Sequence, residues 1–369
     1  MGKQASPALD LAGFGHHLIV GISGPFLSDD DKRLLETIRP IGILLLARNF
    51  LHGRSYQEWI EKLSILFEDI KTFSGRSEMF FTLDHEGGTV IRTPSPITRF
   101  PFAYLFRDRA HDVARATARE LVSLGVNVSW APVADVHSNP SNPIIGYRAF
   151  SSSPYEVAAF AQAYARGLAE EGVIGCAKHF PGHGDTNTDS HLELPVLNIT
   201  KESLFARELV PFRALCESGI PMVMTAHVLF PPIDPAEPAT FSKTLIQELL
   251  RRELRYDGVV VSDDLEMKAI SRRIEDEDAV VDPFIAGCDV TIVARYPYPR
   301  IDHLFNMAET FVKRCESDPL FQDQIHHARC RIDRLLQKTP MPGVQRLPRE
   351  VLEEHAKLAI DIAYPSAVP

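Results

Sequence analysis

Short apolar runs alternate with longer amphipathic stretches from about residue 17 to about residue 315. The apolar runs are rich in Val, Ile, Leu and Phe, as expected for strands buried on both faces of a parallel sheet. They occupy residues 17–23, 41–47, 79–84, 126–136, 173–179, 221–227, 258–264 and 289–294. The alternation predicts a series of βα units.

The stretches between these runs repeat apolar residues at roughly i, i+3 and i+4, which is the spacing of one helix face. Clear examples are residues 55–70, 112–125, 154–172 and 203–219. The pattern predicts an α/β fold, a TIM-type (β/α)8 barrel. An open doubly wound sheet would usually carry a Gly-rich phosphate loop after its first strand, and residues 21–28 (GISGPFLS) match that motif poorly.

Two more helix-like segments, at about 321–338 and 348–363, follow the predicted barrel. We therefore expect a catalytic barrel over residues 1–317 and a helical extension over residues 318–369 that packs on it. A barrel of this kind commonly exceeds about 250 residues within one domain, so the length does not require a second domain.

Charge and cysteine usage limit the partners and the compartment. The chain has 39 basic and 49 acidic side chains, a net charge of −10, which argues against nucleic acid as a partner. No run approaches the roughly 18 apolar residues of a membrane span, and the start has no signal-like apolar core, so we expect no membrane association. The odd number of scattered cysteines, without a CxxC pair, favours a cytoplasmic location. The sequence does not indicate an oligomeric state.

Chemically active residues concentrate where the predicted strands end, which is the active-site face of a βα barrel. The loop after the fifth run, KHFPGHGDTNTDSH (178–191), holds three histidines and two aspartates. Its glycines and proline permit tight turns that fold these groups over the barrel mouth. Considered alone, His179, His183, Asp185, Asp189 and His191 could also form a metal site.

Four motifs together resemble one family. The loop 178–191 is accompanied, in the same order along the chain, by LDHEGGTVIR (83–92), NPIIGYRAF (142–150) and GVVVSDDLEM (258–267). This set resembles the family 3 glycoside hydrolases, in their NagZ-like β-N-acetylglucosaminidase branch. The chain is too short to hold the second α/β domain that many family 3 glucosidases carry.

The resemblance implies a role for each matching residue. Asp263 is implied as the covalent nucleophile, and His191 as the general acid/base with Asp189 as its partner. The residues implied to bind the sugar are Asp84, Arg92, Arg148, Lys178 and His179. No metal and no cofactor is implied.

These roles agree with elementary chemistry. A retaining glycosidase needs a carboxylate on one side of the anomeric carbon and a proton donor on the other. An imidazole, with an ordinary pKa near 6.5, can donate a proton in one step and accept one in the next. We therefore predict an exo-acting β-N-acetylhexosaminidase that hydrolyses terminal non-reducing β-linked N-acetylglucosamine through a covalent glycosyl-enzyme.

Several alternatives stay open from the sequence alone. The chain could be a phosphorylase of the same family, a metal-dependent barrel hydrolase, or an inactive sugar-binding module. Lys178 could form a Schiff base. Asp263 and Asp264 could instead orient the acetamido group of the substrate for substrate-assisted catalysis, and Asp264 could cap a following helix. The natural aglycone is not indicated.

Overall fold

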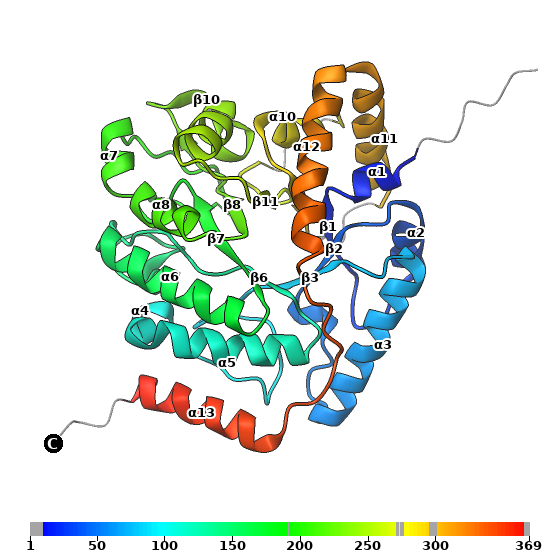
Figure 1. Ribbon diagram of the computed structural model, residues 1–369, viewed down its shortest axis with the longest axis vertical. Helices are drawn as coiled ribbons and strands as arrows, with labels where there is room; N and C mark the ends of the chain where they lie inside the picture. The colour runs from blue at the N-terminus through cyan, green and yellow to red at the C-terminus, as the bar shows by residue number, and fades with distance from the viewer. Residues whose placement is uncertain (1–9, 191, 271–272, 274–276, 295–300, 365–369) are drawn as a thin grey trace, which may run out of the picture.

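The computed structural model describes residues 10–190, 192–270, 273, 277–294 and 301–364. At its centre, eight parallel strands close into a barrel in the order β1-β12-β11-β8-β7-β6-β3-β2 (Figure 1). Their bounds are β1 Leu18–Gly21, β2 Gly42–Leu45, β3 Phe80–Leu83, β6 Val128–Ser129, β7 Ile174–Phe180, β8 Met222–Thr225, β11 Val259–Asp264 and β12 Val290–Val293. Each predicted apolar run contributes one of these strands, so the predicted barrel class is confirmed.

Helices surround the barrel, and two small hairpins lie outside it. The helices are α1 Ala12–Gly15, α2 Asp29–Thr37, α3 Tyr56–Ser74, α4 Ala103–Phe106, α5 Ala110–Ser123, α6 Pro154–Glu170, α7 Lys201–Ala206, α8 Leu209–Glu217, η5 Thr244–Glu253, α10 Asp282–Ala286, α11 Ile301–Ser317, α12 Pro319–Leu336 and α13 Arg349–Ala363. The hairpins pair β4 His85–Gly87 with β5 Val90–Ile91, and β9 Leu229–Phe230 with β10 Asp234–Pro238. Among the described helices, none is long and apolar enough to cross a membrane.

The strands divide the apolar side chains between two cores because successive side chains point to opposite faces. On β1, Ile19 belongs to the apolar cluster inside the barrel, whereas Leu18 and Val20 belong to the larger cluster between strands and helices. On β11, Val259 and Val261 point inward and Val260 points outward. The barrel is therefore a filled core, and a cavity can open only at one of its ends.

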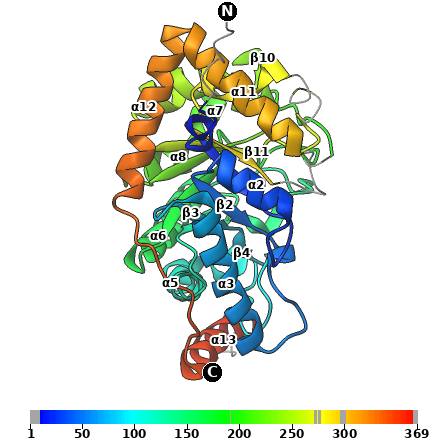
Figure 2. The ribbon, with the colours of Figure 1, turned by 90° about the vertical axis from the view of Figure 1, so that its right-hand side faces the viewer.

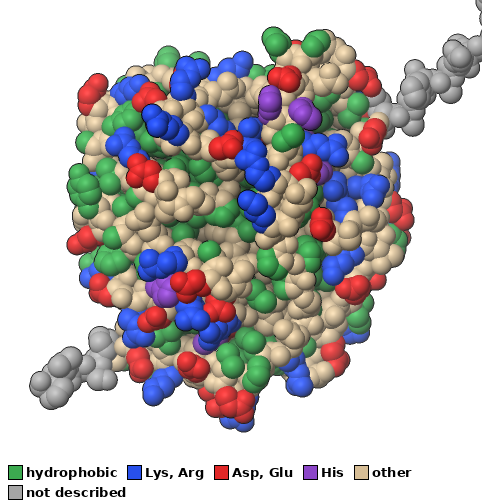
Figure 3. All heavy atoms as spheres, viewed as in Figure 1, with side chains coloured by type: hydrophobic (Ala, Val, Ile, Leu, Met, Phe, Trp, Pro, Cys, Tyr) green, Lys and Arg blue, Asp and Glu red, His purple; other side chains and the backbone are tan. Residues whose placement is uncertain are grey.

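Helix α12 closes the end at which the strands begin. Its Ile332 and Leu336 belong to the cluster inside the barrel, and Figure 2 shows α12 at the left of the molecule. Basic side chains gather in the upper centre of Figure 3. Two arginines of α12 pair with acids outside the helix. Arg331 binds the buried Asp289 at 2.8 Å, and Arg334 binds Asp257 at 2.8 Å. The opposite end is left for the active site.

The proposed boundary at residue 317, between the barrel and the helical extension, stays a prediction.

The local structure departs from the predicted pattern at Pro132 and Pro211. The run 126–136 forms β6 over two residues and pairs again at Val133 with Lys178, and Pro132 between them has no N–H to donate to a neighbouring strand. The predicted helix 203–219 is two helices, α7 and α8. Pro211 cannot donate to the carbonyl of Arg207, and its ring would clash with that carbonyl in a continuous helix.

Candidate active site

A cavity of about 440 Å³ opens where the barrel strands end. This volume is within the usual range for small-molecule sites, about 300–1,000 Å³. Its lining comes from β2, β3, β6, β7, β8, β11 and β12 and the segments that follow them. The lining residues are Leu44, Leu46, Ala47, Arg48, Asp84, Arg92, Trp130, Lys178, Met224, Asp263, Asp264, Met267, Ile292 and Ala294. Four of the predicted site residues, Asp84, Arg92, Lys178 and Asp263, are thus brought together.

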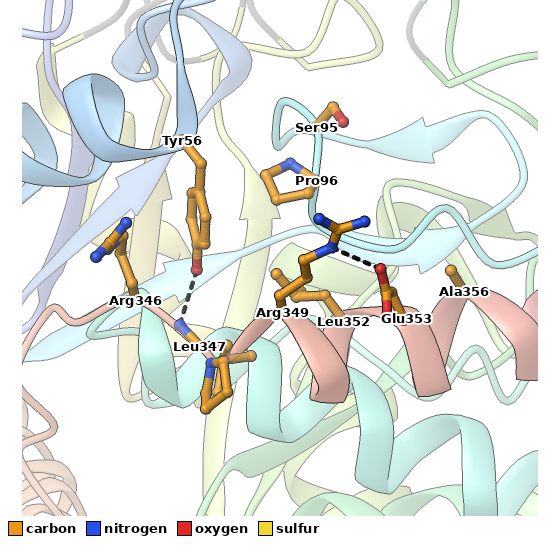
Figure 4. A pocket seen from close by; sticks show the side chains of 10 residues that line it. Tyr56, Ser95, Pro96, Arg346, Leu347, Arg349, Leu352, Glu353 and Ala356 are labelled. Atoms are coloured by element: carbon orange, nitrogen blue, oxygen red, sulfur yellow. Dashed lines mark hydrogen bonds and ion pairs between the residues drawn. The ribbon is translucent and has the colours of Figure 1, made fainter.

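A larger cavity, of about 790 Å³, lies between the start of α3 and α13 (Figure 4). Tyr56 Oη accepts a hydrogen bond from the Leu347 N–H at 3.1 Å, and Arg349 pairs with Glu353 at 2.6 Å. Glu353 is the one carboxylate among its described lining residues, and that carboxylate is already paired. The Tyr56–Leu347 contact attaches the C-terminal segment to α3, and the Arg349–Glu353 pair lies within α13, so size alone does not mark the active site.

Asp263 and Asp264, at the end of β11, have opposite pKa shifts. Burial alone would raise the pKa of Asp263, but electrostatic interactions with His179, His227 and Lys178, together with the Asp264 N–H at 2.8 Å, outweigh it and lower the pKa. Burial raises the pKa of Asp264 to about 7. Asp263 is therefore ionised at neutral pH. Two adjacent acids with separated pKa values are a common arrangement at sites of acid–base and nucleophilic chemistry.

The Asp264 side chain accepts N–H groups from the backbone of Ala294 at 3.0 Å and of Glu266 at 3.1 Å. Residues 265–270 form turns and not the start of a helix, so Asp264 orders a turn where a helix cap was one possibility. His227, which the sequence left unassigned, donates or accepts at Thr240 Oγ1 (2.8 Å) and reaches the Asp264 carbonyl at 3.0 Å through Nε2. These two contacts of His227 help to fix the backbone at Asp263 and Asp264.

Side chains of alternating charge extend from the cavity into the protein behind it. This charge chain consists of Asp84, Lys178, Glu86 and Arg148. Lys178 Nζ lies 2.9 Å from Asp84 Oδ1 and 2.6 Å from Glu86 Oε1. Glu86 also accepts two hydrogen bonds from Arg148, both at 2.8 Å. Arg92 approaches Asp84 only to 4.0 Å. Arg148 is not among the residues that line the cavity, and its role in sugar binding stays a prediction.

The pKa values in this chain follow from its charges. Burial would lower the pKa of Lys178, but Asp84 and Glu86 raise it above its usual value. Burial would raise the pKa of Glu86, but Arg148 and Lys178 lower it. Lys178 is therefore a permanent cation here, whereas a Schiff-base lysine must lose its proton to act as a nucleophile.

His179 is held from behind by a buried acid. Its Nδ1 lies 2.7 Å from Asp135 Oδ2, and Asp135 Oδ1 accepts the N–H groups of His179 and His183 at 3.2 and 2.8 Å. Asp135 is fully buried. An Nδ1–H donated to Asp135 leaves Nε2 of His179 as the second ring position for another partner.

The loop that carries the predicted acid/base is fastened over much of its length. His183 bonds Thr186 Oγ1 at 2.8 Å and Ser190 Oγ at 3.0 Å. Asp185 pairs with Arg207. Asp189 is half-buried, its carbonyl accepts the Leu192 N–H at 2.9 Å, and it is outside the cavity lining. His191, the predicted acid/base, lies outside the described residues.

The metal alternative gains no support from these contacts. His179, His183 and Asp185 each face a protein partner, and within the described ranges no group of three or more His, Cys, Asp or Glu side chains is arranged to hold a metal ion.

Sequence reasoning missed Glu86 and Asp135 as organisers of the site. Glu86 stands inside a recognised motif, and Asp135 stands near the end of the fourth apolar run, so strand-end position was an available signal for both. Their partners, Arg148 and His179, are 62 and 44 residues away along the chain. Such pairings depend on the closed barrel and leave no local pattern.

An ionised aspartate beside a cluster of fixed charges, at the strand-end mouth of a filled parallel barrel, defines a barrel enzyme that acts on a small polar substrate. Comparison with known proteins specifies the class further. The sequence-family model named glycosyl hydrolase family 3 N terminal domain matches residues 27–335 of the chain. The chain belongs to this family and is a glycoside hydrolase.

Relatives of the chain are similar over most of its length. A β-hexosaminidase from Bordetella avium is 33% identical over 369 residues, covering 97% of both chains. One from Alkalilimnicola ehrlichii is 38% identical over 291 residues, covering 76% of this chain and 81% of the relative.

Two solved structures share the fold. A family 3 β-N-acetylglucosaminidase from Paenibacillus sp. has a TM-score of 0.84 and 31% identity, covering 97% of this chain and 68% of that one. NagZ from Neisseria gonorrhoeae, in complex with N-trifluoroacetyl-D-glucosamine, has a TM-score of 0.75 and 29% identity, covering 95% and 98%.

Proposed function

We propose that this protein is a retaining exo-β-N-acetylglucosaminidase, with Asp263 as nucleophile and Asp189 with His191 as the acid/base pair. The observation that carries the proposal is Asp263 itself: a carboxylate with a lowered pKa, lining the cavity at a strand end. The names of the β-hexosaminidase relatives, and the sugar analogue bound to the Neisseria protein, support N-acetylglucosamine as the sugar.

In the proposed first step, Asp263 attacks the anomeric carbon, the bond to the leaving oxygen breaks, and His191 donates a proton to that oxygen. In the second step His191 removes a proton from water, which attacks the anomeric carbon and releases Asp263. Asp189 orients the imidazole and stabilises its charged form, as an aspartate does in a Ser-His-Asp triad.

The charge chain suits the binding of sugar hydroxyls. Asp84 is one-fifth exposed and accepts hydrogen bonds, and Lys178 and Arg92 donate them. Charge-assisted hydrogen bonds discriminate strongly against ligands that lack the matching hydroxyl when the site excludes water. Arg148 and His179 support this surface through Glu86 and Asp135.

The decisive assay compares an aryl N-acetyl-β-glucosaminide with the matching aryl β-glucoside, with and without phosphate. We expect hydrolysis of the first only, unchanged by phosphate. Asp263→Asn should reduce kcat at least about a thousandfold, whereas Asp302→Asn, at an exposed position on α11, should not. Survival of activity in Asp263→Asn would refute the assignment. Formation of a sugar phosphate would identify a phosphorylase.

A second measurement separates the two retaining mechanisms. A fluorinated sugar that forms a slow covalent intermediate should label Asp263, as detected by mass spectrometry of the peptide. Absence of label, together with strong inhibition by a thiazoline analogue, would indicate substrate-assisted catalysis instead.

The cytoplasmic setting belongs to the same proposal. All five cysteines are free thiols, which is typical of a reducing compartment.

A further inference from the structure

The loop after β7 is attached to the junction between helices α7 and α8. Pro211 interrupts helical hydrogen bonding there, so Arg207 and Glu208 lie between the two helices. Arg207 Nε donates to Glu208 Oε1 at 2.5 Å, and Nη2 pairs with the loop residue Asp185. One guanidinium group thus joins the catalytic loop to the barrel's outer layer.

Glu208 lies directly beneath the loop backbone. Its side chain is fully buried, and a Cβ placed on Gly182 would lie 2.9 Å from Glu208 Oε2. Gly182 has φ +137°, a conformation that residues with a Cβ rarely adopt. Oε2 has no hydrogen-bond partner among the described residues. Close packing of this buried carboxyl group against the loop is therefore supported by its hydrogen bond from Arg207.

The neighbouring loop positions are held by other groups. Asp135 accepts the His183 N–H at 2.8 Å, and His183 reaches Ser190 at 3.0 Å. Asp185 adds a charged tie to this segment through Arg207, and it is four residues before Asp189. If Arg207 is removed, the loop loses the ion pair through Asp185 to the α7–α8 junction, and Glu208, whose pKa burial raises to about 7 even beside Arg207, stays buried against the loop without its hydrogen bond from that guanidinium.

We propose that Arg207 is a positioning residue for the acid/base loop. It lies outside the cavity lining and acts through Asp185 and Glu208. Through these two contacts it fixes the position of the loop whose sequence contains Asp189 and His191. This inference rests on the proposed function. It assigns to Arg207 an effect on proton transfer to the leaving group that a general contribution to stability would not produce.

The test uses two aryl N-acetyl-β-glucosaminides that differ in their need for a proton. A dinitrophenyl group leaves without general acid help, whereas a phenyl group requires it. For Arg207→Met we expect kcat/KM to fall about 10- to 100-fold with the phenyl substrate and by less than about threefold with the dinitrophenyl substrate. Arg207→Lys, which keeps one positive charge, should recover part of the loss.

Arg213→Met is the matched control, because Arg213 is an exposed arginine of α8 whose contact is with the Phe205 ring. It should leave both substrates unchanged. A double-mutant cycle with Asp185→Asn adds a second readout: if the two residues act as one tie, the losses will not add. Equal losses on both substrates, no loss, or fully additive losses would each overturn the inference.

Failure of the proposed function would look different. Asp189→Asn removes the proposed partner of the acid/base directly, so it should show the same leaving-group dependence more strongly. If Asp189→Asn shows none, the acid/base assignment is wrong. If Asp189→Asn shows it and Arg207→Met does not, only the positioning role is wrong.

Discussion

Glu86→Gln should destabilise the protein although it changes only one functional group. Glu86 accepts two hydrogen bonds from Arg148 and one from Lys178, at 2.6 to 2.8 Å, and its side chain is 5% exposed. Glutamine keeps one acceptor oxygen and replaces the other with an NH2 group. At least one arginine or lysine donor would then face another donor, and both cations would lose a negative charge.

Removal of one partner from a buried ion pair costs about 3–5 kcal/mol. Lys178 keeps Asp84 as a second partner at 2.9 Å, so we expect the lower end, about 3 kcal/mol in the free energy of unfolding. Urea unfolding followed by circular dichroism measures this. Glu353→Gln is the control: Glu353 also pairs with an arginine, but that pair is exposed, and the loss should be at most about 1 kcal/mol.

The pH dependence provides an independent check. The pKa of Glu86 is lowered in the folded protein, because Arg148 and Lys178 outweigh the effect of burial. Its contribution to stability is therefore complete above the ordinary pKa of a glutamate, about 4.3, and is lost as the pH falls below that value. The difference between wild type and Glu86→Gln should shrink in acid. Equal destabilisation by the two substitutions at neutral pH would refute the buried-pair reasoning.

Three further predictions follow from the site and the core. Asp264 has a pKa raised to about 7, so its own contribution to stability falls as the pH rises from about 4 to about 7, and thermal melts should show Asp264→Asn gaining stability relative to wild type over that range. Asp135→Asn weakens the hold on His179 and should lower kcat/KM about 10- to 100-fold, with unchanged circular dichroism. Ile332→Ala, at a fully buried position of α12, should cost about 2–5 kcal/mol in urea unfolding, whereas Ile360→Ala, at a 59% exposed position of α13, should cost less than about 1 kcal/mol.

Each of these has a clear contrary result. An unchanged pH profile in Asp264→Asn would mean that the aspartate is already ionised in the folded state. Full activity in Asp135→Asn would mean that the His179 ring needs no support. Similar costs at Ile332 and Ile360 would mean that α12 does not seal the barrel.

Strand runs were predictable because burial on both faces leaves a continuous apolar signature that does not depend on distant partners. Ile19, Val259 and their neighbours therefore mark β1 and β11 in the sequence, and the closed parallel barrel follows from their number and spacing. Where a proline removed a backbone donor, at Pro132 and Pro211, the predicted elements were too long. The apolar pattern continues through those positions, whereas regular hydrogen bonding is interrupted there and, after Pro132, resumes from the Ala134 N–H to the Lys178 carbonyl at 2.6 Å.

Asp84, Arg92, Lys178 and Asp263 could be grouped from the sequence, because strand ends of a parallel barrel meet at one mouth. Only the tertiary structure decided how their charges are arranged: which cation Glu86 holds, which acid supports His179, and which aspartate of the pair at 263 and 264 is ionised. Sequence periodicity records where a residue lies along its own element. Ion pairing and pKa depend on distances between elements and on burial, and these exist only once the barrel has closed.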